Sequence, residues 1–210
     1  MVVTDPVLLR GRDAVDVCRR ATAGGGGGGA TMIQVRWKDG TPRELLQLAR
    51  ALVEALPVPV LVNDRMDVAL AAGAAGAHLG HDDPPLDVLR PEVPPGFLLG
   101  ISVGSVTEAE RVRAWPADYW SVGPCFATGN KPDAGRALGP QGFETLARLA
   151  PEGMPVIGIG GITAGTAAEI VRAGAVGVAV IGAVLGATDP QDAARDLRAA
   201  VTDGGSAAPA

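Results

Sequence analysis

Short hydrophobic runs alternate with amphipathic stretches along the whole chain. The runs have the length and the β-branched content of buried strands, and they lie at residues 2–4, 32–36, 58–62, 77–79, 97–102, 118–122, 155–159 and 177–181. Helical spacing of apolar residues between and after them predicts helices at residues 11–21, 42–56, 66–75, 106–114, 141–149, 164–173 and 190–201. This alternation predicts one α/β domain, a parallel (β/α)₈ TIM barrel over residues 1–202. The rival is a doubly wound open sheet, which usually has fewer strands.

The chain is organised around residues 58–83, which read as strand, helix and strand. An acidic residue lies just past the end of each strand, Asp64 after the first and Asp83, at the end of the turn Gly80-His81-Asp82-Asp83, after the second. Because the carboxyl ends of neighbouring parallel strands meet at one edge of a sheet, both carboxylates are expected at the edge where barrels build their sites. With lysines on the same rim, they indicate a divalent cation that holds a phosphate ester. The alternative is that each aspartate caps the helix after its strand.

A second polar pattern lies in the strand at residues 32–36 and just beyond it. Gln34, Arg36 and Lys38 alternate, so they are expected to point to one side, into the mouth of the barrel. An arginine fork and a lysine point charge suit a diphosphate, while a salt bridge to a nearby carboxylate is the alternative for Arg36.

Glycines after the last two predicted strands indicate a phosphate pocket. Gly160 and Gly161 follow the seventh strand, and Ile181 and Gly182 follow the eighth, where barrels commonly bind phosphate through backbone N–H groups. The loop at residues 123–131 is long for a barrel connection, and such loops often close over a ligand.

Composition narrows the functional classes. The net charge is −5 and no block of Lys and Arg occurs, which argues against nucleic acid as a partner. Neither an uninterrupted 18-residue apolar run nor a leader-like start is present, so we expect a cytoplasmic protein without a membrane partner. Cys18 and Cys125 lack metal-type spacing, which suits a reducing compartment.

Two segments are expected to be loose. The six consecutive glycines at residues 24–29 precede a strand rather than a helix, so a slack connector is favoured over a phosphate cradle. Residues 203–210 are expected to form a flexible tail.

Together the motifs resemble the thiamine phosphate synthase and thiazole tautomerase family over nearly the whole chain. The resemblance rests on six short motifs that occur in this order: Gln34-Val-Arg36-Trp-Lys38, Asn63-Asp64, His78-Leu-Gly-His-Asp-Asp83, Gly100-Ile-Ser102, Gly123-Pro-Cys-Phe-Ala-Thr128-Gly-Asn-Lys131 and Gly158-Ile-Gly-Gly-Ile162. It implies a transferase that joins a pyrimidine diphosphate to a thiazole phosphate.

The resemblance also assigns roles. It makes Asp64 and Asp83 the ligands of Mg²⁺ and gives the leaving diphosphate to Arg36, Lys38 and Lys131, with Ser102 on the diphosphate or the pyrimidine. Substrate contacts would come from Gln34, Asn63, Thr128, Asn130, Gly160, Gly161, Ile181 and Gly182.

The chain departs from the family pattern at four positions. Gly104 stands where the tautomerase branch has a proton-transferring histidine, which counts against tautomerase activity. Asn130 replaces a threonine, Gly182 a serine and Trp37 an acidic residue. Alternation predicts that Trp37 faces away from the mouth and packs against helices. These departures keep open a specialised paralogue with another acceptor, or a barrel that only binds thiamine-type phosphates. The oligomeric state, including a homo-oligomer, stays open.

The remaining candidate groups are interpreted as structural. His78 and His81 lack a second His or Cys at ligand spacing, so zinc is not expected. Cys125 has no histidine partner in the pattern and is interpreted as a packed residue.

Overall fold

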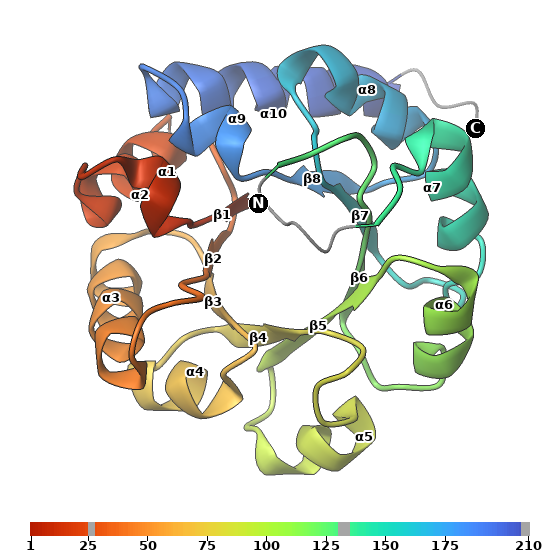
Figure 1. Ribbon diagram of the computed structural model, residues 1–210, viewed down its shortest axis with the longest axis horizontal. Helices are drawn as coiled ribbons and strands as arrows, with labels where there is room; N and C mark the ends of the chain where they lie inside the picture. Colours follow the sequence, from red (N-terminus) through yellow and green to blue (C-terminus); the bar gives the residue numbers. More distant parts are fainter. Residues whose placement is uncertain (25–27, 130–134, 207–210) are drawn as a thin grey trace.

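The computed structural model describes residues 1–24, 28–129 and 135–206, and its strands form one parallel sheet in sequence order (Figure 1). The strands are β1 Val2–Val3, β2 Ile33–Val35, β3 Val60–Asn63, β4 Gly76–Leu79, β5 Leu98–Val103, β6 Tyr119–Val122, β7 Val156–Ile159 and β8 Gly177–Ala179. A parallel bridge between Val2 and Val180 joins the first strand to the end of the last, which closes the ring. The predicted (β/α)₈ barrel is confirmed.

Helices surround the ring in Figure 1, and most lie where the hydrophobic spacing predicts them. They are α1 Pro6–Leu9, α2 Ala14–Thr22, α3 Pro42–Ala55, α4 Met66–Ala72, α5 Leu86–Leu89, the 3₁₀ helix η1 Arg90–Glu92, α6 Val106–Val112, α7 Gly139–Ala147, α8 Ala164–Arg172, α9 Gly182–Leu185 and α10 Pro190–Ser206. The single turns α1, α5 and α9 are absent from the prediction because four residues are too few for a periodic pattern.

The predicted tail at residues 203–210 is wrong in its first half. Helix α10 continues to Ser206, and Gly204 is buried in it. A Cβ at Gly204 would lie 2.9 Å from Cβ of Val171 and 3.0 Å from Cα of Ala168, so the missing side chain lets α10 approach α8 closely. Residues 207–210 lie outside the part of the chain that the structure describes.

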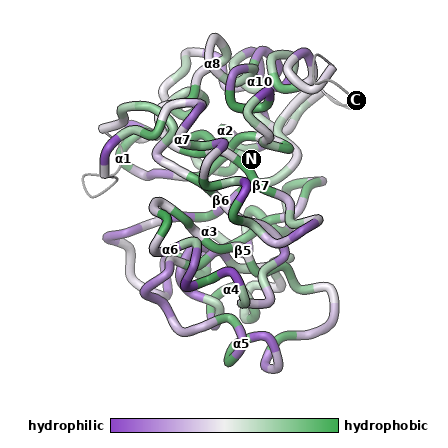
Figure 2. Tube along the Cα trace, turned by 90° about the vertical axis from the view of Figure 1, so that its right-hand side faces the viewer, coloured by the Kyte–Doolittle hydropathy of each residue, from purple (hydrophilic) through white to green (hydrophobic). Residues whose placement is uncertain are grey.

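Strand residues divide by alternation between the barrel interior and the helix layer. Ile33, Leu99 and Ile101 are fully buried toward the helices, whereas Gln34 and His78, which alternate with such positions, are buried polar residues of the interior. In Figure 2 the hydropathy changes repeatedly along the tube, as expected when every strand contributes to one core. Trp37 packs against that core, as predicted.

No described helix combines the length and apolar character needed to cross a membrane. The glycine run lies before β2, as predicted, and Gly28 N–H donates to the Gly24 carbonyl at 2.9 Å. Residues 25–27, in the middle of that run, lie outside the described residues.

Candidate active site

A cavity of about 550 Å³ opens at the carboxyl ends of the strands, and we call it the upper cavity. Its lining gathers predicted site residues from distant parts of the sequence, namely Gln34, Arg36, Lys38, Asn63, Asp64, Asp83, Ser102, Thr128, Gly160, Gly161, Ile181 and Gly182. Asn130 and Lys131 lie outside the residues that the structure describes.

Asp64 and Asp83 leave the neighbouring strands β3 and β4 and border the same cavity. Asp64 has a φ of 60°, a left-handed conformation that a non-glycine residue rarely adopts and that often marks functional sites. Its N–H donates to the His78 carbonyl at 2.8 Å, so the bond to β4 holds this turn. The Asp83 carboxylate accepts a hydrogen bond from Gly80 N–H at 2.7 Å.

The helix-capping alternative for these two aspartates is wrong. Helix α4 begins after Arg65 and helix α5 after Pro85, and neither helix has a side-chain capping bond. Asp83 instead closes its own turn with Gly80, and Asp64 lies one residue before the cap position.

The donor set at this edge suits magnesium. Carboxylate oxygens are hard ligands, and Mg²⁺ usually takes one or two of them together with waters and substrate phosphate oxygens. Among the described residues, no three His, Cys, Asp or Glu side chains gather into a complete protein cage. Asp64 and Asp83 therefore fit an ion that a phosphorylated substrate helps to bind.

Arg36 is held by a carboxylate that sequence reasoning did not identify. Its Nη1 lies 3.4 Å from Oδ2 of Asp5, and both side chains are largely buried. The hydroxyl of Thr4 fixes the same residue through the Arg36 backbone, donating to its carbonyl at 3.0 Å and accepting from its N–H at 2.9 Å. The salt-bridge alternative is thus realised, and Arg36 still lines the upper cavity.

The turn after β7 is built for close backbone approach. Gly160 and Gly161 have φ values of 93° and 65°, and a Cβ at Gly161 would lie 2.5 Å from the Ala127 carbonyl oxygen. The loop after β6 folds onto this turn, because the N–H of Cys125 donates to the Ile159 carbonyl at 2.8 Å. A side chain at position 161 would push the two segments apart.

A buried hydrogen-bond chain leads from the barrel interior to the upper cavity. His78 Nδ1 lies 2.8 Å from the Tyr119 hydroxyl oxygen, and its Nε2 lies 2.9 Å from Oγ of Ser102. The sequence pattern predicts a structural role for His78 and gives Tyr119 no role. The available signal was Gly100, which lies between them in register on β5 and has no side chain to separate their rings.

With this geometry in place, similarity to known proteins decides the family. Residues 1–184 match the family described as thiamine monophosphate synthase. The chain belongs to this family.

Individual relatives agree with the family assignment. The chain is 48% identical to the thiamine-phosphate synthase of Methanoculleus marisnigri over 94% of this chain and 92% of that protein. It is 46% identical to the one of Roseiflexus castenholzii over 93% of this chain and 85% of the relative. A solved thiamine phosphate pyrophosphorylase from Pyrococcus furiosus superposes with a TM-score of 0.83 at 36% identity, covering 97% of this chain and 95% of its own. As a member of the thiamine monophosphate synthase family, the chain is a transferase of thiamine biosynthesis.

More distant structures share only the fold. A 3-hexulose-6-phosphate synthase superposes with a TM-score of 0.66 at 22% identity, over 95% of this chain and 98% of the other.

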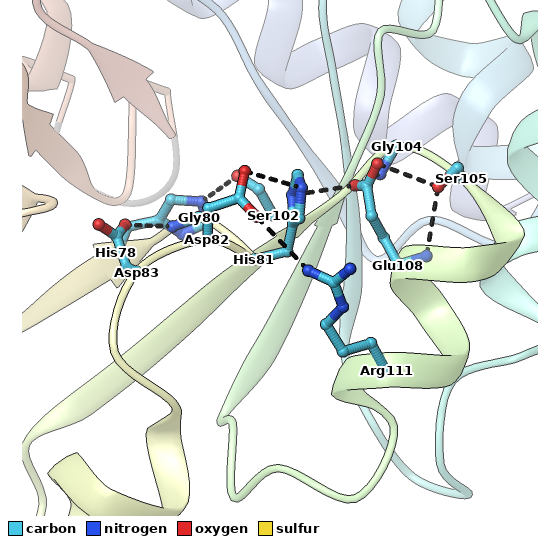
Figure 3. Close-up of polar contacts among 10 residues, drawn as sticks. All are labelled: His78, Gly80, His81, Asp82, Asp83, Ser102, Gly104, Ser105, Glu108 and Arg111. Atoms are coloured by element: carbon cyan, nitrogen blue, oxygen red, sulfur yellow. Dashed lines mark hydrogen bonds and ion pairs between the residues drawn. The ribbon is translucent and has the colours of Figure 1, made fainter.

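The rim beside β5 carries a polar cluster at the point where this family member departs from the expected histidine (Figure 3). His81 lies between two carboxylates, with Nδ1 3.3 Å from Oε2 of Glu108 and Nε2 3.2 Å from Oδ2 of Asp82. Glu108 also accepts a hydrogen bond from Gly104 N–H at 2.7 Å. The cluster therefore links the loop that carries Asp83 to the loop after β5, and no sequence motif predicts this link.

Cys125 is not activated as a nucleophile. The thiol is fully buried, and burial raises its pKa to about 12, so the thiolate is scarce at neutral pH.

Proposed function

We propose that this family member transfers the 4-amino-5-hydroxymethyl-2-methylpyrimidine group from its diphosphate to hydroxyethylthiazole phosphate, giving thiamine phosphate and diphosphate. The observation that carries the proposal is the composition of the upper cavity. Paired carboxylates and the cations Arg36 and Lys38 border one part of it, and the glycine turns after β7 and β8 border another. One phosphorylated substrate suits each part.

The proposed reaction needs neither a protein nucleophile nor a general base. The bond between the pyrimidine methylene carbon and the diphosphate oxygen breaks first, and its electron pair leaves with the diphosphate. The electron-rich pyrimidine stabilises the resulting methylene cation. The thiazole nitrogen then donates its lone pair to that carbon. Catalysis is mostly positioning and electrostatic stabilisation.

The leaving diphosphate is assigned to the positive groups of the β2 side. Arg36 presents a fork whose orientation is fixed by Asp5, and Lys38 adds a point charge at the rim. We assign Lys131 to the same group from the sequence pattern, together with Thr128 as a hydrogen-bonding contact. Replacing Lys131 by alanine should lower turnover by orders of magnitude.

Mg²⁺ is the proposed cofactor, held by Asp64 and Asp83. When bound, it supplies positive charge that neutralises the diphosphate. The left-handed turn at Asp64 and the Gly80 bond at Asp83 orient these carboxylates before substrate arrives.

The remaining contacts are assigned by their place around the cavity. Gly160, Gly161, Ile181 and Gly182 are assigned to the thiazole phosphate through their backbone groups. Gln34 and Asn63 line the same cavity and are assigned to the pyrimidine diphosphate. Asn130 is assigned to the substrate from its sequence position alone.

The cytoplasm is the proposed compartment. Cys18 and Cys125 are both buried and unpaired, as suits a reducing environment.

The test is an incubation with both heterocyclic substrates, with and without Mg²⁺, in which thiamine phosphate is detected by mass. Product that depends on Mg²⁺ is the expected result. Binding of the pyrimidine diphosphate without product would replace the proposal by a changed acceptor or a binding role, with Gly104, Asn130 and Gly182 the first positions to restore. Equal product without Mg²⁺ would remove the metal from the proposal and keep the transfer.

A further inference from the structure

Arg12 connects two single-turn helices across the seam of the barrel, the junction at which β1 meets β8. Helices α1 and α9 follow these two strands and lie next to each other at the seam (Figure 1). The Arg12 guanidinium donates to the carbonyls of Leu8 and Leu9 at the end of α1, with Nε 3.1 Å from the Leu9 oxygen. It also donates to the carbonyls of Leu185 and Ala187 at the end of α9, with Nη1 3.0 Å from the Ala187 oxygen. One planar fork therefore joins the carboxyl ends of both helices.

The turn before Arg12 places the guanidinium between the two helices. Arg10 and Gly11 have consecutive positive φ values of 52° and 80°, which reverse the chain directly after α1. The Arg12 N–H then donates to the Leu9 carbonyl at 3.0 Å. A left-handed arginine is uncommon, and here it lets Arg12 lie beside the helix that precedes it in the sequence.

Helix α9 depends on Arg12 more than α1 does. Helix α1 begins at Asp5, whose carboxylate accepts a hydrogen bond from the Val7 N–H at 3.0 Å and so caps the helix. Helix α9 begins at Ile181 without a side-chain capping bond. A helix of a single turn is not stable alone, so the bonds from Arg12 are a main support of α9.

The ordered end of α9 fixes the backbone that borders the upper cavity. The Leu185 N–H donates to the Ile181 carbonyl at 3.0 Å, and the Gly186 N–H donates to the Gly182 carbonyl at 2.9 Å. Ile181 and Gly182 line the upper cavity, whereas Arg12 does not. Arg12 can therefore act on the cavity only through this turn.

We propose that Arg12 is a positioning residue that holds the turn of Ile181 and Gly182 in place for the phosphate of the thiazole substrate. The inference rests on the proposed function for the identity of that phosphate. Because a misplaced turn moves the backbone groups that meet the phosphate, losing Arg12 weakens binding of this substrate. The pyrimidine diphosphate is assigned to the opposite, β2 side of the cavity and depends on Arg12 much less.

Arg90 provides a matched control at the lower end of the barrel. It is half-buried like Arg12 and also joins distant carbonyls, with Nη1 2.8 Å from the Phe97 oxygen and Nη2 2.7 Å from the Pro116 oxygen. These residues precede β5 and β6, far from the α9 turn along the ring of strands. Arg90→Ala should therefore lower thermal stability without changing either KM value.

The first experiment needs no substrate. Amide hydrogen exchange of Leu185 and Gly186 should become at least about tenfold faster in Arg12→Ala, because opening of the α9 turn no longer breaks the bonds to the guanidinium. Arg90→Ala should leave these two amides at their native rates. Native exchange rates in Arg12→Ala would overturn the proposal, since the turn would then be held without Arg12.

The second experiment measures both KM values. Arg12→Ala should raise KM for hydroxyethylthiazole phosphate about tenfold and change KM for the pyrimidine diphosphate by less than about twofold. Arg12→Lys keeps the charge but loses the fork, so it should shift the same KM in the same direction by a smaller factor. If Arg12→Ala does not fold, Arg12→Lys decides. Equal rises in both KM values, or a native KM for the thiazole phosphate, would reduce Arg12 to a structural brace.

Calorimetric binding of hydroxyethylthiazole phosphate distinguishes a failure of this inference from a failure of the proposed function. If the native protein binds this ligand but gives no product, about tenfold weaker binding by Arg12→Ala supports the role of Arg12, and equal binding overturns it. If the native protein does not bind the ligand, the assignment of the turn to this phosphate is wrong, and the role of Arg12 is overturned with it.

Discussion

The two ends of the barrel both contain a cavity, and they differ in chemistry more than in size. The upper cavity holds about 550 Å³ and is bordered by Arg36, Lys38, Asp64 and Asp83. A lower cavity of about 330 Å³ lies at the amino ends of the strands, with a lining that is mostly apolar and includes Met32, Leu98, Ile157, Val178 and Leu197. Volume alone therefore does not identify a site in this fold, whereas the gathering of charged and polar groups does.

The backbone shows the same division. At the upper end Gly161 combines a left-handed conformation with close contact to another loop, and Asp64 is left-handed without being glycine. At the lower end Gly174 is also left-handed, but a Cβ there would meet no atom within 4 Å. The left-handed conformation of Gly174 only turns the chain at the lower end, whereas those of Gly161 and Asp64 also shape the cavity at the upper end.

The largest difference in activity between the two ends is expected when these two glycines are replaced by alanine. Gly161→Ala should lower kcat/KM for the thiazole phosphate on the order of 100-fold, because displacing the turn after β7 misplaces the substrate. Gly174→Ala carries similar backbone strain, so it should reduce the free energy of unfolding by about 1 kcal/mol and leave kinetics unchanged. Steady-state kinetics and urea unfolding check both variants. Equal losses of activity would show that the two ends are not independent.

Substitutions at Asp64 should affect the stability and the activity of the protein in different ways. Asp64→Asn should raise the Mg²⁺ concentration for half-maximal activity at least about tenfold, since one of two carboxylate ligands is lost. Asp64→Gly should lose the same function and gain about 1 kcal/mol of stability, because glycine adopts a φ of 60° without strain. A Mg²⁺ titration and a denaturation curve measure the two effects. An unchanged titration would remove Asp64 from the metal site.

A substitution at the lower cavity should change the stability of the protein but not its activity. Leu197→Ala removes a buried side chain of α10 and should cost about 2–3 kcal/mol of unfolding free energy. We expect kcat and both KM values to change by less than about twofold. That corresponds to about 0.5 kcal/mol, the usual effect of a substitution that lies away from the site. A larger change in kcat would mean that packing at the lower end reaches the upper cavity.

The smallest effect is expected at the glycine run. Shortening residues 24–29 to three glycines should leave activity unchanged and alter stability by at most about 0.5 kcal/mol, because loop-closure entropy depends only weakly on length. Activity assays and thermal unfolding test this. A large loss of activity would show that the run does more than connect α2 to β2.

The elements that the sequence predicted are those with a strong local pattern. Each strand of the barrel is marked by its own run of apolar residues, and Asp64 and Asp83 could be placed because they lie just past the ends of two such runs. The four residues of α9 are too few for a periodic pattern, and the contacts that hold this turn come from far away in the sequence: Arg12 donates hydrogen bonds to the carbonyls of Leu185 and Ala187.

The unpredicted parts of the site depend on partners that lie far away in the sequence. Arg36 pairs with Asp5, which stands outside any motif. His78 looked structural because a lone histidine gains its meaning only from neighbours, here Tyr119 and Ser102 on two other strands. Single-sequence patterns do not reveal which strand residues will lie in register.

The contact between Gly100 and Tyr119 also constrains how this chain can evolve. While the Tyr119 ring lies over Gly100, any side chain gained at position 100 collides with it, so that substitution is closed. Once position 119 carries a small residue, position 100 becomes free to change. The order of the two mutations therefore matters. A lineage that first replaces Tyr119 by a small residue and then gains a side chain at position 100 cannot regain the tyrosine in one step, so the effect of either substitution depends on the other.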